Sequence, residues 1–177
     1  RGAVSLGTPR DLRVLVPEAS RAGSFEYNRW LCTPNGMLTD EQGQAVDCST
    51  TPLAAGSVVT GSLRNPAFDL LVVLDKADGG RALLLIEVKF VTNPLPNGVV
   101  DEKVGLLVER YRGKLFVDDG AVDDGTTPVQ AAKLGIGRVR EEDVVLVFLA
   151  HGALAGILQL PSKTDFRGQV LATTSAQ

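Results

Sequence analysis

The sequence predicts an α/β fold in which a mixed central β-sheet is flanked by helices. Three observations predict this class: short runs rich in Val, Leu and Ile recur from Ser57 onward, residues 100–115 have the periodicity of a helix, and further apolar runs follow that helix. A chain of 177 residues, 44% of them hydrophobic, is long enough for one domain with a substantial core. Elements in this order pack as a sheet covered by helices.

Three apolar runs form the predicted centre of the sheet. They are SVVTGSL (57–63), AFDLLVVL (67–74) and ALLLIEVKF (82–90), and each is bounded by turn residues. The last two carry apolar residues on both faces, as buried central strands do. The KADGGR segment between them contains Asp78-Gly79, which predicts that the two strands form a hairpin.

Two helices are predicted after this hairpin. The first is amphipathic, with apolar residues at spacings of three and four: Val100, Val104, Leu107, Val108, Tyr111 and Leu115. Asp101 lies near its start, where a carboxylate suits the unpaired amides and the helix dipole. The second is short, with Thr127-Pro128 as its cap and first residue and Gly135 as its end.

The segment before Ser57 is irregular. DLRVLVPE (11–18) predicts a strand, SFEYNRWL (24–31) predicts one or two helical turns, and residues 33–56 have the Thr, Pro, Gly and Asp content of a loop. Residues 1–56 are therefore expected to pack on a core formed by residues 57–160.

The C-terminal part of the core carries two further apolar runs. DVVLVFLA (143–150) and ALAGILQL (153–160) each predict a strand, and residues 161–177 predict a loosely ordered tail. His151 is the only histidine of the chain and stands between the two runs. Its position favours a strand-end residue over a catalytic one.

Composition limits the partners and the compartment. The net charge is −3 and the pI is about 5.2, which argues against non-specific coating of nucleic acid but allows one local binding groove. Two cysteines, Cys32 and Cys48, favour free thiols in a reducing compartment, so we expect an intracellular protein, with the nucleus included. No apolar run reaches the roughly 18 residues of a membrane span, so no membrane partner is expected. The chain does not begin with Met, and we expect a processed product or a part of a longer protein.

Three polar residues interrupt the apolar hairpin. Glu87 and Lys89 are two residues apart, so in a strand their side chains point to the same face. A turn centred on Gly79 sets Asp69 opposite Lys89, and a shift by one pairing step sets it opposite Glu87. Both registers bring the three side chains within cross-strand reach, whereas a register shifted by one residue would send Asp69 to the other face.

This combination of groups suits phosphodiester hydrolysis. The carboxylates of Asp69 and Glu87, together with the carbonyl of Val88, are hard oxygen ligands for one or two Mg²⁺ ions, which Mn²⁺ can replace. A metal ion lowers the pKa of water and makes it a nucleophile, and Lys89 could orient that water or stabilise charge on the phosphoryl group. The sequence therefore predicts a metal-dependent nuclease site.

At these residues the chain resembles the PD-(D/E)xK nuclease superfamily, whose fold is restriction-endonuclease-like. Asp69 matches the first acid, Glu87 the second and Lys89 the lysine, and the helix and strand that follow match the order of that fold. The resemblance covers about half of the chain, residues 57–150, and departs from the motif in that the proline, Pro66, does not adjoin the first acid. It implies a Mg²⁺-dependent endonuclease, rather than an exonuclease, that acts on DNA rather than RNA.

The resemblance also suggests three accessory residues. Some members of the superfamily add a helical acid upstream, for which Glu26 is the candidate, and the alternative is a plain surface glutamate. A polar or basic residue of the helix after the hairpin often faces the site, which makes Arg110 and Lys114 candidates for contacts with nucleic acid. The alternative for both is a solvated helix face.

A weaker resemblance and two alternative functions complete the predictions. RNPAFDLLVV followed by LLLIEVKF is similar to the nuclease-like domains of crinkler effectors and of retrotransposon-hot-spot proteins, which are linked to an NTPase. The chain could instead be a catalytically inactive nuclease-fold module that binds nucleic acid or a protein partner, or an effector interaction domain. In those cases Glu87 and Lys89 could face water on an edge strand, and Asp69 could merely end its strand. One site cuts one strand, so cutting of both strands implies a homodimer or two successive events.

Overall fold

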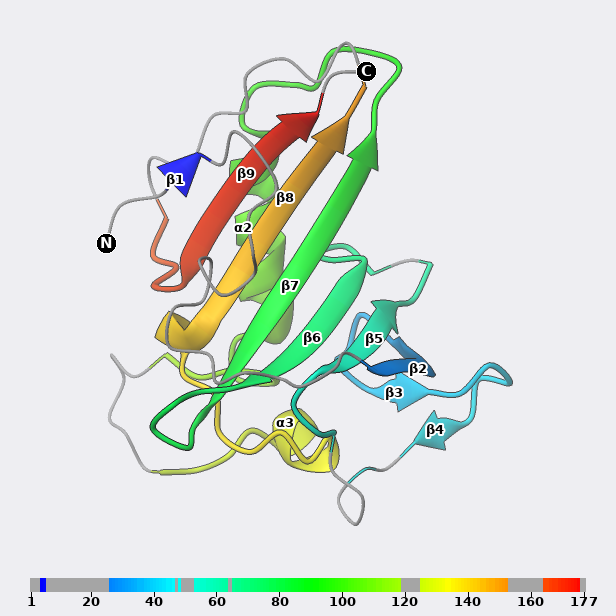
Figure 1. Cartoon of the computed structure of the whole chain (residues 1–177), viewed down its shortest axis with the longest axis vertical. Coiled ribbons are helices and arrows are strands. Elements are labelled where there is room, and N and C mark those ends of the chain that lie inside the picture. Colours follow the sequence, from blue (N-terminus) through cyan, green and yellow to red (C-terminus); the bar gives the residue numbers. More distant parts are fainter. Residues whose placement is uncertain are drawn as a thin grey trace.

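The computed structural model describes residues 4–5, 26–46, 48, 53–63, 65–118, 125–152 and 164–175. In these residues one mixed sheet has the strand order β1-β9-β8-β7-β6-β5-β2-β3-β4, and α2 packs along one of its faces (Figure 1). The strands are β1 (Val4–Ser5), β2 (Glu26–Cys32), β3 (Leu38–Thr39), β4 (Ala45–Val46), β5 (Ser57–Gly61), β6 (Leu70–Asp75), β7 (Arg81–Phe90), β8 (Val144–His151) and β9 (Gln169–Ser175). The helices are α2 (Val99–Tyr111), α3 (Val129–Lys133) and the 3₁₀ turn η1 (Glu141–Asp143).

The centre of the sheet confirms the predicted α/β class with a mixed sheet. β6 is antiparallel to both of its neighbours, β5 and β7, whereas β7, β8 and β9 run parallel. The four predicted strands nearest the centre correspond to β5, β6, β7 and β8. The parallel pair β7 and β8 needs a crossover connection, and α2 lies in that connection, as expected for parallel strands.

The β6–β7 hairpin has the second of the two predicted registers. Leu70 pairs with Ile86 and Asp75 pairs with Arg81, so the register, continued by one residue, sets Asp69 level with Glu87. The turn closes through hydrogen bonds from the amide of Gly79 to the carbonyl of Lys76 and from the amide of Lys76 to the carbonyl of Gly80. Gly79 has a φ of 85°, a conformation that a side chain would strain.

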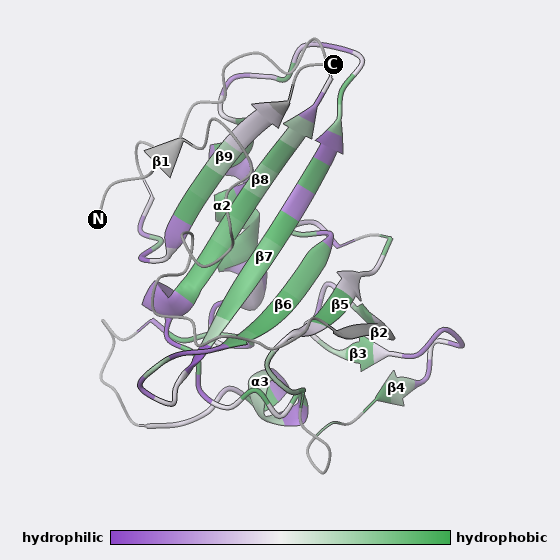
Figure 2. Ribbon diagram, in the orientation of Figure 1, coloured by the Kyte–Doolittle hydropathy of each residue, from purple (hydrophilic) through white to green (hydrophobic). Residues whose placement is uncertain are grey.

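The core on the α2 face explains which hairpin residues face the helix. Val100, Val104, Leu107 and Tyr111 of α2 are buried in one cluster with alternate strand residues, namely Leu71, Val73, Leu83 and Leu85. A second cluster, which includes Val72, Leu74 and Leu84, packs on the opposite face. Figure 2 shows that apolar residues predominate along β6, β7 and β8. Glu87 and Lys89 continue the series of Leu83 and Leu85 and therefore lie on the α2 face.

Both predicted helices form, but their ends differ. α2 ends at Tyr111 rather than at position 115, because Arg112 is extended and Gly113, with a φ of 76°, begins a turn. In α3, Pro128 is the cap rather than the first helical residue. The buried residues of α3 belong to the same cluster as those of α2, so in the described part of the chain the helices cover one face of the sheet.

Two predictions at the ends of the chain are wrong. Residues 26–32 form strand β2, parallel to β5, rather than helical turns, because strand pairing outweighs the weak helical pattern. The predicted loose tail contains β9, which pairs with β8 along its length; its Val and Thr residues suit a strand. The expected loop 33–56 also contains the short hairpin of β3 and β4. The strands predicted at 11–18 and 153–160 lie outside the described residues.

Candidate functional site

Asp69 immediately precedes β6 and lies beside β7. Its amide donates to the carbonyl of Ile86 (2.8 Å) and its carbonyl accepts from the amide of Gly61 (2.6 Å). Its carboxylate Oδ2 accepts a hydrogen bond of 2.6 Å from the amide of Val88. The carboxylate thus replaces a strand carbonyl as the acceptor and lies beside the residue that separates Glu87 from Lys89.

Glu87 is a buried carboxylate that contacts two ammonium groups. Its exposure is 2%, and its Oε1 lies 2.8 Å from Nζ of Lys89 and 2.7 Å from Nζ of Lys103. Lys89 is 40% exposed and Lys103 is 12% exposed. A buried carboxylate is stable only when it is paired, so these two contacts explain how β7 tolerates a charge at this position.

The charges of Asp69, Glu87 and Lys89 act on one another. The hydrogen bond to Glu87 raises the pKa of the Lys89 ammonium, and the negative charges of Glu87 and Asp69 raise it further. Lys89 therefore stays protonated well above neutral pH. The structure brings together all three residues that the sequence predicted, with the ammonium between solvent and the buried carboxylate.

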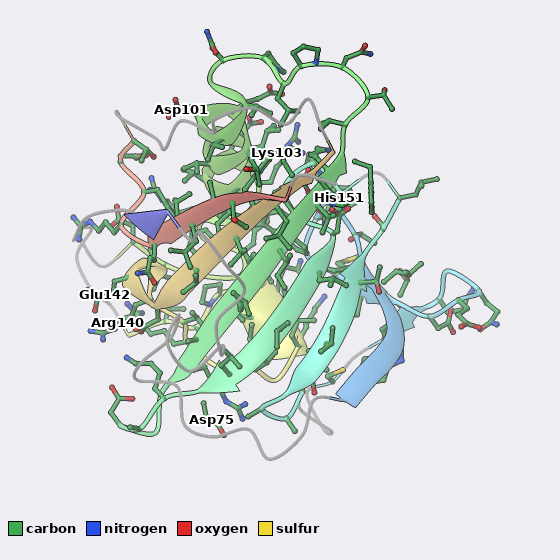
Figure 3. All side chains as sticks on the ribbon, turned by 45° about the horizontal axis from the view of Figure 1, so that its top comes forward. Asp75, Asp101, Lys103, Arg140, Glu142 and His151 are labelled. Atoms are coloured by element: carbon green, nitrogen blue, oxygen red, sulfur yellow. The ribbon has the colours of Figure 1, made fainter. Side chains whose placement is uncertain are left out.

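Lys103 is the residue of this cluster that the sequence analysis missed. It comes from α2, and Figure 3 shows it toward the end of the sheet where β7 and β8 terminate. Its Nζ also donates to the carbonyl of Pro66 (2.6 Å). A signal was present: on a helical wheel Lys103 lies about 60° from Val100, at the edge of the apolar stripe that packs on the sheet.

The turn that carries Asp69 is held by Asn65. Its Oδ1 accepts from the amides of Ala67 (3.1 Å) and Phe68 (3.3 Å), and its Nδ2 donates to the carbonyl of Cys32 (3.2 Å). An Asn that bonds the amides two and three residues ahead is a common way to fix a turn. The turn formed by residues 65–69 is thereby tied to β2.

The donors at this site fit a hard divalent cation. The N–H and C=O groups of one strand residue point to the same side, so the carbonyl of Val88 points, like its amide, toward Asp69. Asp69, Glu87 and the Val88 carbonyl offer only oxygen atoms, which Mg²⁺ prefers. In the described residues no three His, Cys, Asp or Glu side chains gather as a metal site. The donors that the sequence predicted are two carboxylates and one carbonyl.

The accessory candidates lie away from this cluster. The pairing through β5 and β6 sets Glu26 level with Leu83, about 13 Å along the strands from Glu87 and three strands away. Glu26 is also in a strand rather than a helix, so the prediction that it shares the metal is wrong: its backbone is too distant.

Arg110 and Lys114 are not part of the cluster either. Arg110 lies about 10 Å along the helix axis from Lys103. Its side chain is 48% exposed and pairs with Glu109 at 3.5 Å. Lys114 follows the end of α2 in a turn, where its amide donates to the carbonyl of Tyr111. Lys103 is the basic residue of α2 that reaches Glu87, because it lies on the helical turn that passes that residue.

His151 ends β8, as its sequence position predicted. Its ring packs edge-on against Phe90 with centroids 5.5 Å apart, and its carbonyl accepts from the amide of Val91. Cys32 and Cys48 are both buried free thiols, which agrees with the absence of a disulfide scaffold. No described helix has the length and apolar character needed to cross a membrane.

Comparison with known proteins does not assign this arrangement of residues to a family. No family model matches the chain, and neither the curated proteins nor the solved structures contain a match. The function is therefore inferred from the residues themselves.

Proposed function

We propose that the chain is a Mg²⁺-dependent nuclease with a restriction-endonuclease-like core that cleaves DNA rather than RNA. The observation that carries this proposal is the hydrogen bond of 2.6 Å from the Val88 amide to the Asp69 carboxylate. It places one acid beside the Glu87-Val88-Lys89 segment, with the second acid and the lysine on the same strand. This is the arrangement that the resemblance to the PD-(D/E)xK superfamily implies.

The order of elements supports the same proposal. The acid-bearing turn precedes β6, the β6–β7 hairpin follows, and α2 leads into β8, which is parallel to β7. That order matches the one that the resemblance implies over residues 57–150. The site lies on the α2 face, where both carboxylates can approach one cation.

Each residue of the site has a distinct task in this mechanism. Asp69, Glu87 and the carbonyl of Val88 would hold Mg²⁺. A cation held there would supply Lewis acidity toward the phosphodiester and would lower the pKa of a water molecule, so that its deprotonated form could act as the nucleophile near neutral pH. The Val88 amide keeps the Asp69 carboxylate oriented by holding Oδ2. Lys89, protonated and 40% exposed, can meet the phosphoryl group and stabilise its developing charge.

The charge of the cluster suits a cation and a polyanion together. Asp69 and Glu87 carry two negative charges, and Lys89 and Lys103 carry two positive ones, so the four side chains sum to zero. A divalent cation then gives the site a local positive charge that attracts a phosphodiester, although the whole chain has a net charge of −3. A basic stripe is not needed for such local binding.

A second candidate function is a catalytically inactive nuclease-fold module that binds nucleic acid or a protein. The observation that favours it is the pairing of Glu87 with two lysines, which gives the carboxylate a stable structural role without a metal ion. The two candidates differ in whether a divalent cation bound by Asp69 and Glu87 supports cleavage.

A Mn²⁺ titration of the wild-type chain tests the proposal. We expect calorimetric binding that is lost in Asp69→Ala and Glu87→Ala, and cleavage of DNA that falls on the order of 10²–10³-fold in both. Lys89→Ala should keep Mn²⁺ binding and lose cleavage. Asp75→Ala is the matched control, because Asp75 ends the same strand at its far end and should leave both readouts unchanged.

The outcomes separate the two candidates. Mn²⁺ binding without cleavage of single-stranded or double-stranded substrates, or no Mn²⁺ binding at all, would favour the inactive module. The salt dependence of DNA binding then shows whether that module contacts phosphates, because each contact steepens the decline of affinity with salt. An effector interaction domain would show no such dependence.

A further inference from the structure

One ammonium group contacts both Glu87 and the turn that carries Asp69. Nζ of Lys103 lies 2.7 Å from Oε1 of Glu87 and donates to the carbonyl of Pro66 at 2.6 Å. Pro66 belongs to the 65–69 turn, whose last residue is Asp69. A single side chain from α2 therefore contacts the second acid directly and the first acid through three residues of a fixed turn.

The two lysines on Glu87 are held to different degrees. Lys103 is 12% exposed and has an ion pair and a carbonyl hydrogen bond, so two of its three donors are engaged in protein contacts. Lys89 is 40% exposed and forms an ion pair with Glu87 at 2.8 Å. Lys89 can move toward solvent at small cost, whereas Lys103 would have to leave a carbonyl that is itself half-buried.

We propose that Lys103 is a positioning residue that fixes Glu87 and the Asp69-bearing turn relative to each other and remains in place when a divalent cation binds. The proposal rests on the proposed function, because it assigns Lys103 a task in that same site. Lys89 is then the ammonium that leaves Glu87 as the cation arrives and becomes available to the phosphoryl group. Lys103 makes no contact with the substrate, because its donors face Glu87 and Pro66.

The positioning role and the charge of Lys103 predict opposite changes in Mn²⁺ affinity when Lys103 is replaced. Lys103 is a positive charge beside a cation site, so simple electrostatics predicts that Lys103→Met tightens Mn²⁺ binding. Positioning predicts the reverse, because without Lys103 the carboxylate and the turn lose their common partner. Groups that orient metal ligands change metal affinity by about 10- to 100-fold when they are removed. We expect a weakening of that size.

The test is Mn²⁺ affinity, measured by calorimetry on the full chain. Lys103→Met should bind Mn²⁺ about 10-fold or more weakly than wild type. Lys89→Met removes the other ammonium from the same oxygen and should bind Mn²⁺ at least as tightly as wild type. Lys133→Met, an exposed lysine of α3, controls for the change in net charge and should bind as wild type does. Binding by Lys103→Met that equals or exceeds that of wild type would overturn the positioning role.

A second measurement needs no variant, in case Lys103→Met fails to fold. In a crystal structure of the wild-type chain with Mn²⁺, Nζ of Lys103 should remain within hydrogen-bond distance of the Pro66 carbonyl while Nζ of Lys89 has left Glu87. Departure of Lys103 with Lys89 in place would refute the positioning role while leaving the metal site intact. Failure of the wild-type chain to bind Mn²⁺ would refute the proposed function and this inference together.

Discussion

Two buried glutamates, Glu87 and Glu141, are held in different ways. Their exposures are 2% and 1%, and each meets a residue from α2 or from its C-terminal end. Nη2 of Arg112 lies 2.8 Å from Oε1 and 3.1 Å from Oε2 of Glu141, and Nε lies 3.1 Å from Oε1. Both lysine contacts of Glu87 fall on Oε1.

The difference distinguishes a structural ion pair, at Glu141, from the candidate site at Glu87. The planar guanidinium of Arg112 matches both oxygens of Glu141 and also pairs with Asp165 at 2.7 Å, so this carboxylate is fully engaged. The ammonium groups on Glu87 are point charges, and the shortest contact of each is with Oε1. Glu141 therefore secures the end of α2 to the start of β8, whereas Glu87 is paired with two separate ammonium groups, one of which, that of Lys89, is 40% exposed.

The largest expected effect comes from removing the ion pair between Arg112 and Glu141. Arg112→Met leaves Glu141 buried without its partner, which should lower the free energy of unfolding by about 3–5 kcal/mol. Arg140→Met is the control, because Arg140 is 45% exposed and its ion pairs with Glu142 and Asp143 should be worth about 1 kcal/mol or less. Urea unfolding of both variants measures the difference. Equal losses would show that Glu141 is no better held than a surface charge.

The next prediction exchanges the two glutamates for glutamine and measures what Mn²⁺ adds to stability. A cation that binds only the folded state stabilises it by about 2.7 kcal/mol at 100 times its dissociation constant. Glu87→Gln should lose this gain, and Glu141→Gln should retain it even though its stability without Mn²⁺ is lower. Thermal unfolding with and without Mn²⁺ gives both values. A gain that disappears in Glu141→Gln and survives in Glu87→Gln would reverse the assignment.

A smaller effect tests the turn beside Glu87 without touching its charges. A Cβ at Gly61 would lie 2.4 Å from the carbonyl oxygen of Phe68, so Gly61→Ala must displace the 65–69 turn. We expect a loss of about 1–3 kcal/mol in the free energy of unfolding and weaker Mn²⁺ binding. Gly105→Ala, in α2 with open space around the added Cβ, should stabilise the fold by about 0.5–1 kcal/mol. Similar results for the two variants would mean that the turn is not closely packed.

The central strands and the two acids could be predicted from the sequence, because the patterns that indicate them are local. The runs that became β6 and β7 are apolar over their length, and Asp78-Gly79 marks the turn between them. The turn still allowed two registers, and the structure selects the one that sets Asp69 level with Glu87. Hydrogen bonding along the whole hairpin decides between them, and a turn motif does not contain that information.

The features that the sequence did not show depend on distant partners. β2 pairs with β5 and β9 pairs with β8, and the short segments 26–32 and 169–175 gain strand structure only from those neighbours. Lys103 belongs to the site because α2 crosses β7 near Glu87, a relation set by the connection between the two elements rather than by spacing. Arg110 and Lys114 have the same chemistry at the wrong helical turn.

The smallest effect concerns buried neutral groups of the core near the Asp69 turn. Their contribution to stability depends on alkaline pH. Burial raises the pKa of the Cys32 thiol from 9.0 to about 12, and burial likewise raises the pKa of Tyr111. The stability that these neutral groups contribute is complete below pH 9 and is lost as pH rises toward the folded-state pKa, because the unfolded chain releases the proton first. The pKa values of Lys89 and Arg112 are also raised, so these two side chains stay largely protonated at pH 10.

For Cys32 alone we expect a loss of about 1 kcal/mol in the free energy of unfolding between pH 9 and pH 10. Cys32→Ala should be less stable than wild type at pH 7.5 because it loses packing, but its stability should decline less over this interval. Urea unfolding at pH 7.5, 9 and 10 measures both declines. Parallel declines would mean that the thiol ionises as readily in the folded chain as in the unfolded one. In that case water would reach the core beneath the Asp69 turn, and the rigidity assigned to that turn would have to come from Asn65 and Lys103 alone.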